Sequence, residues 1–88
     1  MVKMLLEYNL LIFQYCFKYT VFKFTNTDKT YYAAVVEMSN RGGEFEIIQS
    51  KVLNDLSDAK KYLLELTELN FCSDDINELN ESIHFLEE

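Results

Sequence analysis

The sequence predicts an α+β fold: an antiparallel sheet of three to four strands, followed by two helices that pack on one face of the sheet. Apolar and polar residues alternate through much of residues 1–53, which is the period of half-buried strands. In residues 54–88 the apolar residues recur every three or four positions, as they do along one side of a helix. Because strands and helices occupy separate parts of the chain, we expect a single domain over 1–88, with the sheet in 1–53 and the helices in 54–88.

The first predicted strand pair lies in residues 2–24. Every even position from Val2 to Ile12 is apolar, which predicts a strand, although its Leu, Met and Glu residues also favour a short helix. From Tyr15 the apolar residues move to odd positions. Such a change of parity predicts a bulge or break near Phe13 and Gln14, followed by a strand over 15–24.

Two further strands are predicted before the helices. Residues 25–29 have the composition of a turn, and residues 31–38 are apolar at both parities, which is typical of a central strand. The segment from Ser39 to Gly43 contains both glycines of the chain and predicts a turn. Residues 44–53 then form the second strand of a hairpin.

Two apolar stripes predict the helices. Asp55 or Ser57 can cap the first helix, and Ser73 can cap the second, where Asp74 and Asp75 lie favourably near the positive end of the helix dipole. The stripe of the first helix consists of Leu56, Ala59, Tyr62, Leu63, Leu66 and Leu69, and that of the second consists of Ile76, Leu79, Ile83 and Leu86.

The N-terminal segment has no secretory or membrane pattern, since Glu7, Asn9 and Gln14 interrupt its apolar run. We therefore expect a soluble, cytoplasmic protein. Cys16 and Cys72 could form one disulfide in a secreted domain, but two buried thiols in a reducing compartment fit this expectation better.

No catalytic or metal site is predicted. His84 is flanked on its helix by Glu81 and Glu88, yet no nucleophile accompanies them, so an exposed histidine among carboxylates is the simpler interpretation. The acidic residues from Asp74 to Glu81 lack the glycine-bearing loop that calcium sites use. The two glycines are adjacent, which excludes the common phosphate-binding and hydrolase motifs. We expect neither an enzyme nor a bound cofactor or metal.

The distribution of charge is the most informative feature for function. The net charge is −7; residues 1–51 carry six basic and five acidic side chains, whereas residues 52–88 carry two and ten. This acidity argues against direct binding of nucleic acid or of an anionic membrane. The acidic residues of 52–88 either keep the protein in solution or form a surface that docks on a protein with a basic surface, such as one that binds nucleic acid. The predicted contact carboxylates are Asp58, Glu65, Glu68, Asp75, Glu78 and Glu81.

Aromatic residues are concentrated in the predicted sheet. Ordinary sheet packing accounts for them, but aromatic sheets can also stack single-stranded bases, and Lys18, Lys23 and Lys29 lie nearby in the sequence. An uncovered sheet could instead pair with a second copy to form a homodimer. The residues predicted for this self-association are Tyr8, Tyr15, Phe17 and Tyr19.

From Tyr31 onward, the order of an apolar strand, a glycine turn, a Glu-rich strand, "DLSDAKKYLLEL" and "SDDINELNESIHFLEE" resembles a family of short bacterial proteins of unknown function. In size, acidity and lack of catalytic motifs the chain is also similar to phage-encoded anti-CRISPR and other anti-defence inhibitors. These resemblances imply a non-enzymatic inhibitor or regulator that binds a protein. The alternative is a host-encoded regulatory or structural module that self-associates through its sheet.

Overall fold

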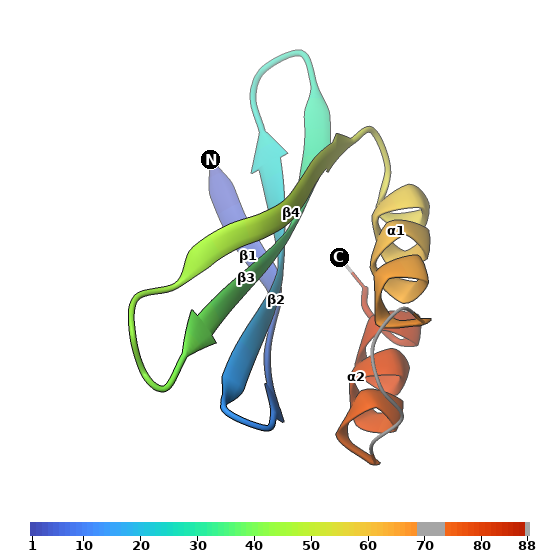
Figure 1. Ribbon diagram of the computed structural model, residues 1–88. Coiled ribbons are helices and arrows are strands. Elements are labelled where there is room, and N and C mark those ends of the chain that lie inside the picture. The colour runs from blue at the N-terminus through green and yellow to red at the C-terminus, as the bar shows by residue number, and fades with distance from the viewer. Residues whose placement is uncertain (69–73, 88) are drawn as a thin grey trace.

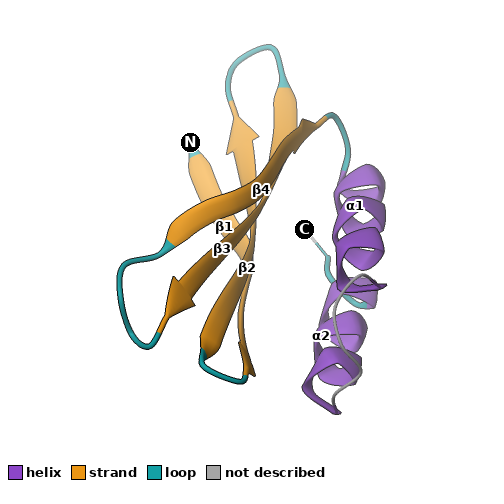
Figure 2. Cartoon of the chain, viewed as in Figure 1, coloured by secondary structure: helices purple, strands orange, loops and turns teal. Residues whose placement is uncertain are grey.

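The computed structural model describes residues 1–68 and 74–87 and has the predicted α+β architecture (Figure 1). A four-stranded antiparallel sheet, with its strands in the order β1-β2-β3-β4, precedes two helices. Both helices lie in one layer beside the sheet (Figure 2). The elements are β1 (Val2–Ile12), β2 (Tyr15–Thr25), β3 (Thr30–Asn40), β4 (Glu46–Leu53), α1 (Leu56–Glu68) and α2 (Asp74–His84).

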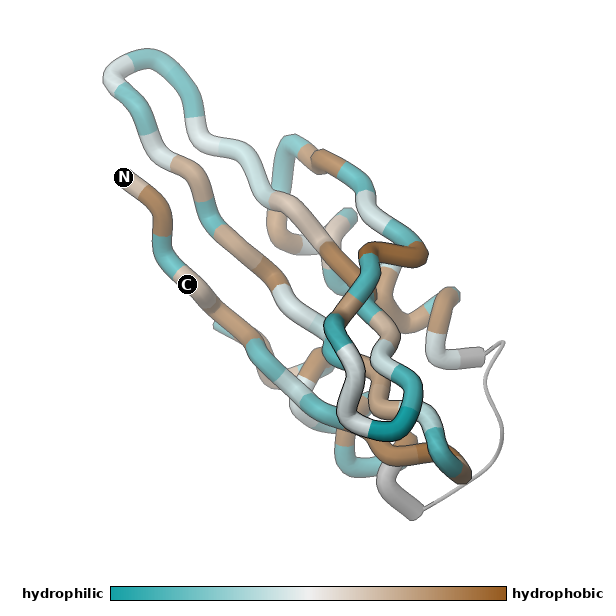
Figure 3. The backbone as a smooth tube through the Cα atoms, turned by 60° about the vertical axis from the view of Figure 1, so that its left-hand side comes forward, coloured by the Kyte–Doolittle hydropathy of each residue, from teal (hydrophilic) through white to brown (hydrophobic). Residues whose placement is uncertain are grey.

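The first segment is a strand and not a helix. The turn between β1 and β2 falls at Phe13 and Gln14, where the sequence predicts a break, and Phe13 has a φ of 56°. In the β2–β3 turn, the side-chain Oδ1 of Asn26 accepts hydrogen bonds from the backbone N–H groups of Asp28 (3.1 Å) and Lys29 (2.9 Å). This turn is the polar end of the long β2–β3 hairpin, and it is the teal and white tip at the top of Figure 3.

The β3–β4 turn lies where the sequence predicts a hairpin. Gly42 has a φ of 76°, which glycine adopts without steric cost, and Arg41 precedes it with a φ of 51°. The Ser39 hydroxyl donates a hydrogen bond of 2.6 Å to the carbonyl oxygen of Gly43 and closes the turn. The N–H of Arg41 donates to the carbonyl oxygen of Gln14, 3.0 Å away, so the neighbouring β1–β2 turn is held beside it.

The strand register defines two faces of the sheet, because residues paired across strands project to the same side. One row, Tyr8, Tyr19 and Val36, lies on the face that contacts the helices, which we call the inner face. The next row, Glu7, Thr20, Val35 and Ser50, lies on the opposite, outer face. No helix or strand among residues 1–68 and 74–87 covers the outer face (Figure 1).

A bulge in β1 changes which of its residues face the helices. The alternation in the sequence places all even residues from Val2 to Ile12 on one face, and this interpretation is wrong for the first part of the strand. Met4 pairs with Phe22, but Leu6 pairs with Val21, so Leu5 is an extra residue and the parity reverses there. Val2 and Met4 therefore project from the outer face, whereas Leu6 projects from the inner face.

The core lies between the inner face and the two helices. On the sheet side its fully buried residues include Leu10, Tyr19 and Val21, and on the helices Leu63 and Leu79. The predicted apolar stripes are confirmed by the burial of Ala59, Leu63, Ile76, Leu79, Ile83 and Leu86. The predicted positions Leu69 and Ser73 lie outside the described residues.

In the described part of the chain, the helices are too short and too polar to cross a membrane. Cys16 is a free thiol that is half-buried on β2. Cys72, the other member of the predicted thiol pair, lies outside the described residues.

Candidate protein-binding surface

The first helix presents carboxylates and lysines together. Oδ1 of Asp55 accepts a hydrogen bond of 2.8 Å from the N–H of Asp58, so Asp55 is the N-cap of α1. Burial of Ala59 and Leu63 then fixes the rotation of the helix and leaves Asp58, Lys61 and Glu65 exposed. These three residues follow each other at three- and four-residue steps and share one helix face, so Lys61 lies between the two carboxylates.

The second helix presents carboxylates alone. Ile76, Leu79 and Ile83 are buried against the rest of the core and orient α2, which leaves Glu78 and Glu81 exposed. These two residues are three positions apart and therefore lie on neighbouring turns of one face. The sequence of α2 contains four acidic residues and neither lysine nor arginine. The uncompensated negative charge of the helical layer is thus concentrated on α2.

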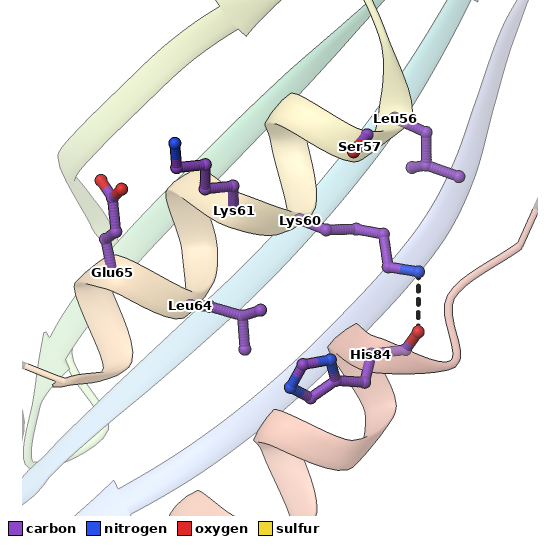
Figure 4. Close-up of a pocket in the computed structure, with 7 residues that line it drawn as sticks. All are labelled: Leu56, Ser57, Lys60, Lys61, Leu64, Glu65 and His84. Atoms are coloured by element: carbon purple, nitrogen blue, oxygen red, sulfur yellow. Dashed lines mark hydrogen bonds between the residues drawn. The ribbon is translucent and has the colours of Figure 1, made fainter.

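Lys60 of α1 holds the C-terminal end of α2. Its Nζ atom donates a hydrogen bond of 2.7 Å to the backbone carbonyl oxygen of His84 (Figure 4). It donates a second one, of 3.0 Å, to the backbone carbonyl oxygen of Leu86. The last carbonyl groups of a helix have no partner within the helix and carry partial negative charge, so a lysine ammonium is well suited to this position. This contact fixes α2, and with it Glu78 and Glu81, relative to α1.

A second polar contact joins the C-terminal end of α1 to the middle of α2. The buried hydroxyl of Thr67 lies 2.7 Å from Oδ1 of Asn80 and 2.8 Å from the carbonyl oxygen of Leu64. Thr67 is near the end of α1 and Asn80 is in the middle of α2. Together with Lys60, this pair sets the position of α2 along α1 by directional hydrogen bonds as well as by apolar packing.

An open hollow of about 750 Å³ lies between α1 and the end of α2 (Figure 4). Three nitrogen-bearing side chains line it together with one carboxylate, so this part of the acidic layer is locally basic. The Lys60 ammonium is already bound to backbone carbonyl groups, and the imidazole of His84 is exposed. The lining residues are Leu56, Ser57, Lys60, Lys61, Leu64, Glu65 and His84.

A smaller hollow of about 260 Å³ lies between β4 and α1 and also mixes charges. Lys51 and Lys61 line it together with Asp58 and Glu65. The Nζ atom of Lys51 is 5.5 Å from the ring centroid of Tyr62, an exposed cation–π contact. The surface of α1 toward β4 is therefore close to neutral, in contrast to that of α2.

The six predicted contact carboxylates do not form one uniform surface. Glu78 and Glu81 are exposed on α2, whereas Asp58 and Glu65 are exposed on α1 among lysines. Glu68 and Asp75 belong to the helical segments, but their side chains lie outside the described part of the structure. The acidic surface that can face a partner is thus best defined by Glu78 and Glu81.

The four residues predicted for self-association lie on the inner face. Tyr19 is 1% exposed and belongs to the core, and Tyr8 and Phe17 pack against that core. Tyr15 is half-buried and its ring centroid is 6.5 Å from that of Phe17. A second copy cannot reach Tyr19 while the helices are in place. Tyr8, Tyr15 and Phe17 are only half-buried, so self-association through these three residues stays a prediction.

No group of three or more His, Cys, Asp or Glu side chains is arranged to hold a metal ion in residues 1–68 and 74–87. Two features of the surface were not predicted from the sequence. Nothing in the sequence pattern indicates that Lys60 reaches the end of α2. The apolar outer face could have been suspected from Phe22 and Phe24, which are even-numbered residues in a strand whose apolar core residues, Tyr19 and Val21, are odd-numbered.

Comparisons with protein-family models, with curated proteins and with solved structures found no match to this chain. The fold class is defined by its own topology: a four-stranded antiparallel meander with a two-helix layer on one face. Its function therefore has to be inferred from the chemistry of the surfaces described above.

Proposed function

We propose that the protein is a non-enzymatic protein-binding protein that docks the exposed acidic face of α2 on a basic surface of another protein. The observation that carries this proposal is the exposure of Glu78 and Glu81 on a helix that contains neither lysine nor arginine. A partner that presents lysine and arginine residues, as nucleic-acid-binding proteins do, has the complementary charge. By occupying such a surface the protein acts as an inhibitor or regulator, in the manner of small acidic anti-defence proteins.

The tethered geometry of α2 supports this proposal. An ordered surface binds more tightly than a flexible one, because less conformational freedom is lost on association. Lys60 and Thr67 attach α2 to α1 by hydrogen bonds at two points. The Leu79 and Ile83 side chains of α2 are fully buried in the core. Glu78 and Glu81 are therefore presented at a fixed spacing before a partner arrives.

A pair of charge-reversal variants tests the proposal. The partner is first captured on the immobilised protein from a lysate and identified by mass spectrometry, and its affinity is then measured by calorimetry at low and high salt. Glu78→Lys with Glu81→Lys should weaken binding by about 10-fold or more and reduce its salt dependence, because complementary charge is replaced by like charge.

The matched control reverses two exposed carboxylates of the β3–β4 hairpin, in Glu44→Lys with Glu46→Lys. Both double variants change the net charge by the same amount, so a difference between them reports the position of the charge and not its total. The control should keep its affinity within about threefold, as expected for a charge outside the contact. Equal effects of the two double variants, or no effect of the α2 variant, would rule out docking through α2.

A further inference from the structure

We propose that the outer face of the sheet packs against the same face of a second copy, so that two chains form a symmetric dimer with the helices on the outside. This inference is independent of the acidic surface on α2, which lies on the opposite side of the sheet. It also differs from the self-association predicted from the sequence, because the residues involved are not the four tyrosine and phenylalanine residues of the inner face.

The outer face carries a continuous apolar row across all four strands. Met4, Phe22, Ala33 and Val52 are paired in register from β1 to β4. The two ends of the row are the most open, since Met4 is 49% exposed and Val52 is 66% exposed. Apolar side chains in this position stay in contact with water unless another surface covers them.

A second apolar row lies directly beside the first. Val2, Phe24 and Tyr31 are paired across β1, β2 and β3, and Val2 is 59% exposed. The rings of Phe24 and Tyr31 are stacked, with centroids 5.0 Å apart. We call the residues that dominate the two rows the outer apolar patch: Val2, Met4, Phe22, Phe24, Tyr31 and Val52.

The size of the outer face suits a dimer. Strands β1, β2 and β3 each have 11 residues. Strand β4 has 8 residues. At about 3.3 Å per residue and about 4.8 Å between strands, the four-stranded face measures roughly 650 Å². A stable protein–protein interface buries about 800 Å² on each partner. Two such faces packed about 10 Å apart would thus form an interface close to the standard size, with a helix–sheet–sheet–helix arrangement.

The charge of the outer face permits contact with its own copy. By the strand register its charged residues are Glu7, Lys18 and Glu37, and Lys18 lies directly opposite Glu37. The Nζ atom of Lys18 is also 4.3 Å from the ring centroid of Phe45. Because both signs are present, two outer faces can meet without the repulsion that two α2 helices would experience.

Face-to-face packing is favoured over pairing at the sheet edges. Both edge strands are interrupted by register shifts, between Met4 and Leu6 in β1 and opposite Val36 and Glu37 in β4. Bulges of this kind twist an edge strand and disrupt the row of free hydrogen-bonding groups that a further strand would need. The outer face, in contrast, offers its apolar rows without any rearrangement of the backbone.

Sedimentation velocity of the intact chain over a micromolar to millimolar dilution series tests the dimer. We expect the mass to rise with concentration from 10.4 kDa to about twice this value. Met4→Glu with Val52→Glu places carboxylates at both ends of the apolar row and should raise the dimer dissociation constant by about 100-fold, since these charges would be buried without partners.

The matched control is Asn77→Glu with Phe85→Glu, which adds the same charge to exposed positions of the helical layer, and it should dimerise like the unmodified chain. Loss of the circular dichroism spectrum would show that the outer-face double variant is unfolded. The single variant Val52→Glu is then measured by sedimentation velocity in its place. A strict monomer at every concentration would overturn the proposal. So would equal dissociation of the two double variants, or concentration-dependent protection of β4 edge amides from hydrogen exchange, which would indicate edge pairing.

Discussion

The contact between Lys60 and the end of α2 can be tested without knowledge of any partner. Lys60→Met keeps an unbranched side chain but removes the ammonium group that donates to the carbonyl oxygens of His84 and Leu86. A hydrogen bond contributes about 0.5–1.5 kcal/mol to folding, and a cation at a helix C-terminus adds about 0.3–1 kcal/mol. One of the two bonds is exposed, so solvent screening holds the expected loss to about 1–2 kcal/mol.

The assay is urea unfolding followed by circular dichroism, with thermal unfolding as a second measurement. Each kcal/mol lost should lower the melting temperature by about 4–8 °C in a domain of this size. Lys61→Met is the matched control, because Lys61 is adjacent, exposed and lines the same hollow, and its replacement changes the net charge equally. It should alter the free energy of unfolding by no more than about 0.5 kcal/mol. Equal losses in the two variants would refute the proposed role of Lys60.

Three further predictions concern stability. Leu79→Ala removes a fully buried side chain from α2 and should cost about 2–5 kcal/mol in urea unfolding, whereas Phe85→Ala, at an 80% exposed position, should cost little; a small loss at Leu79 would contradict the described core. Thr20→Val should stabilise the protein by about 1 kcal/mol in the same assay, because the Thr20 hydroxyl is buried with no hydrogen-bond partner among the described residues; destabilisation would reveal a partner for it. Gly42→Ala should lower stability by about 1 kcal/mol through its positive φ alone, since an added Cβ would meet nothing within 4 Å, and an unchanged melting temperature would argue against this turn geometry.

Most of the fold could be predicted because apolar periodicity reports burial directly. The stripe Ile76, Leu79, Ile83 of α2 is buried as predicted, and the parity change at Phe13 corresponds to the first hairpin turn. The bulge at Leu5 could not be predicted, because Val2 and Met4 continue the even-numbered apolar pattern even though they project from the other face. An apolar residue on an uncovered face looks the same in sequence as one in the core.

The candidate surfaces could be predicted from the sequence less completely than the fold. The sequence gives the number of carboxylates near the C-terminus, but the separation of Asp58 and Glu65 from Glu78 and Glu81 depends on how two helices are rotated and packed. The position of Lys60 under the end of α2 is likewise a contact between residues 24 and 26 positions apart. Such contacts leave no periodic trace in a single sequence.

The order of the strands has a consequence for how the chain folds. Each strand pairs with its neighbour in sequence, so every hairpin closes a short loop at small entropic cost. The second helix differs, because it packs against β1 at the opposite end of the chain. We therefore expect α2 to dock last and to open first in native-state hydrogen exchange. Since α2 also carries Glu78 and Glu81, a partner that requires them at their fixed positions would distinguish the completely folded chain from its intermediates.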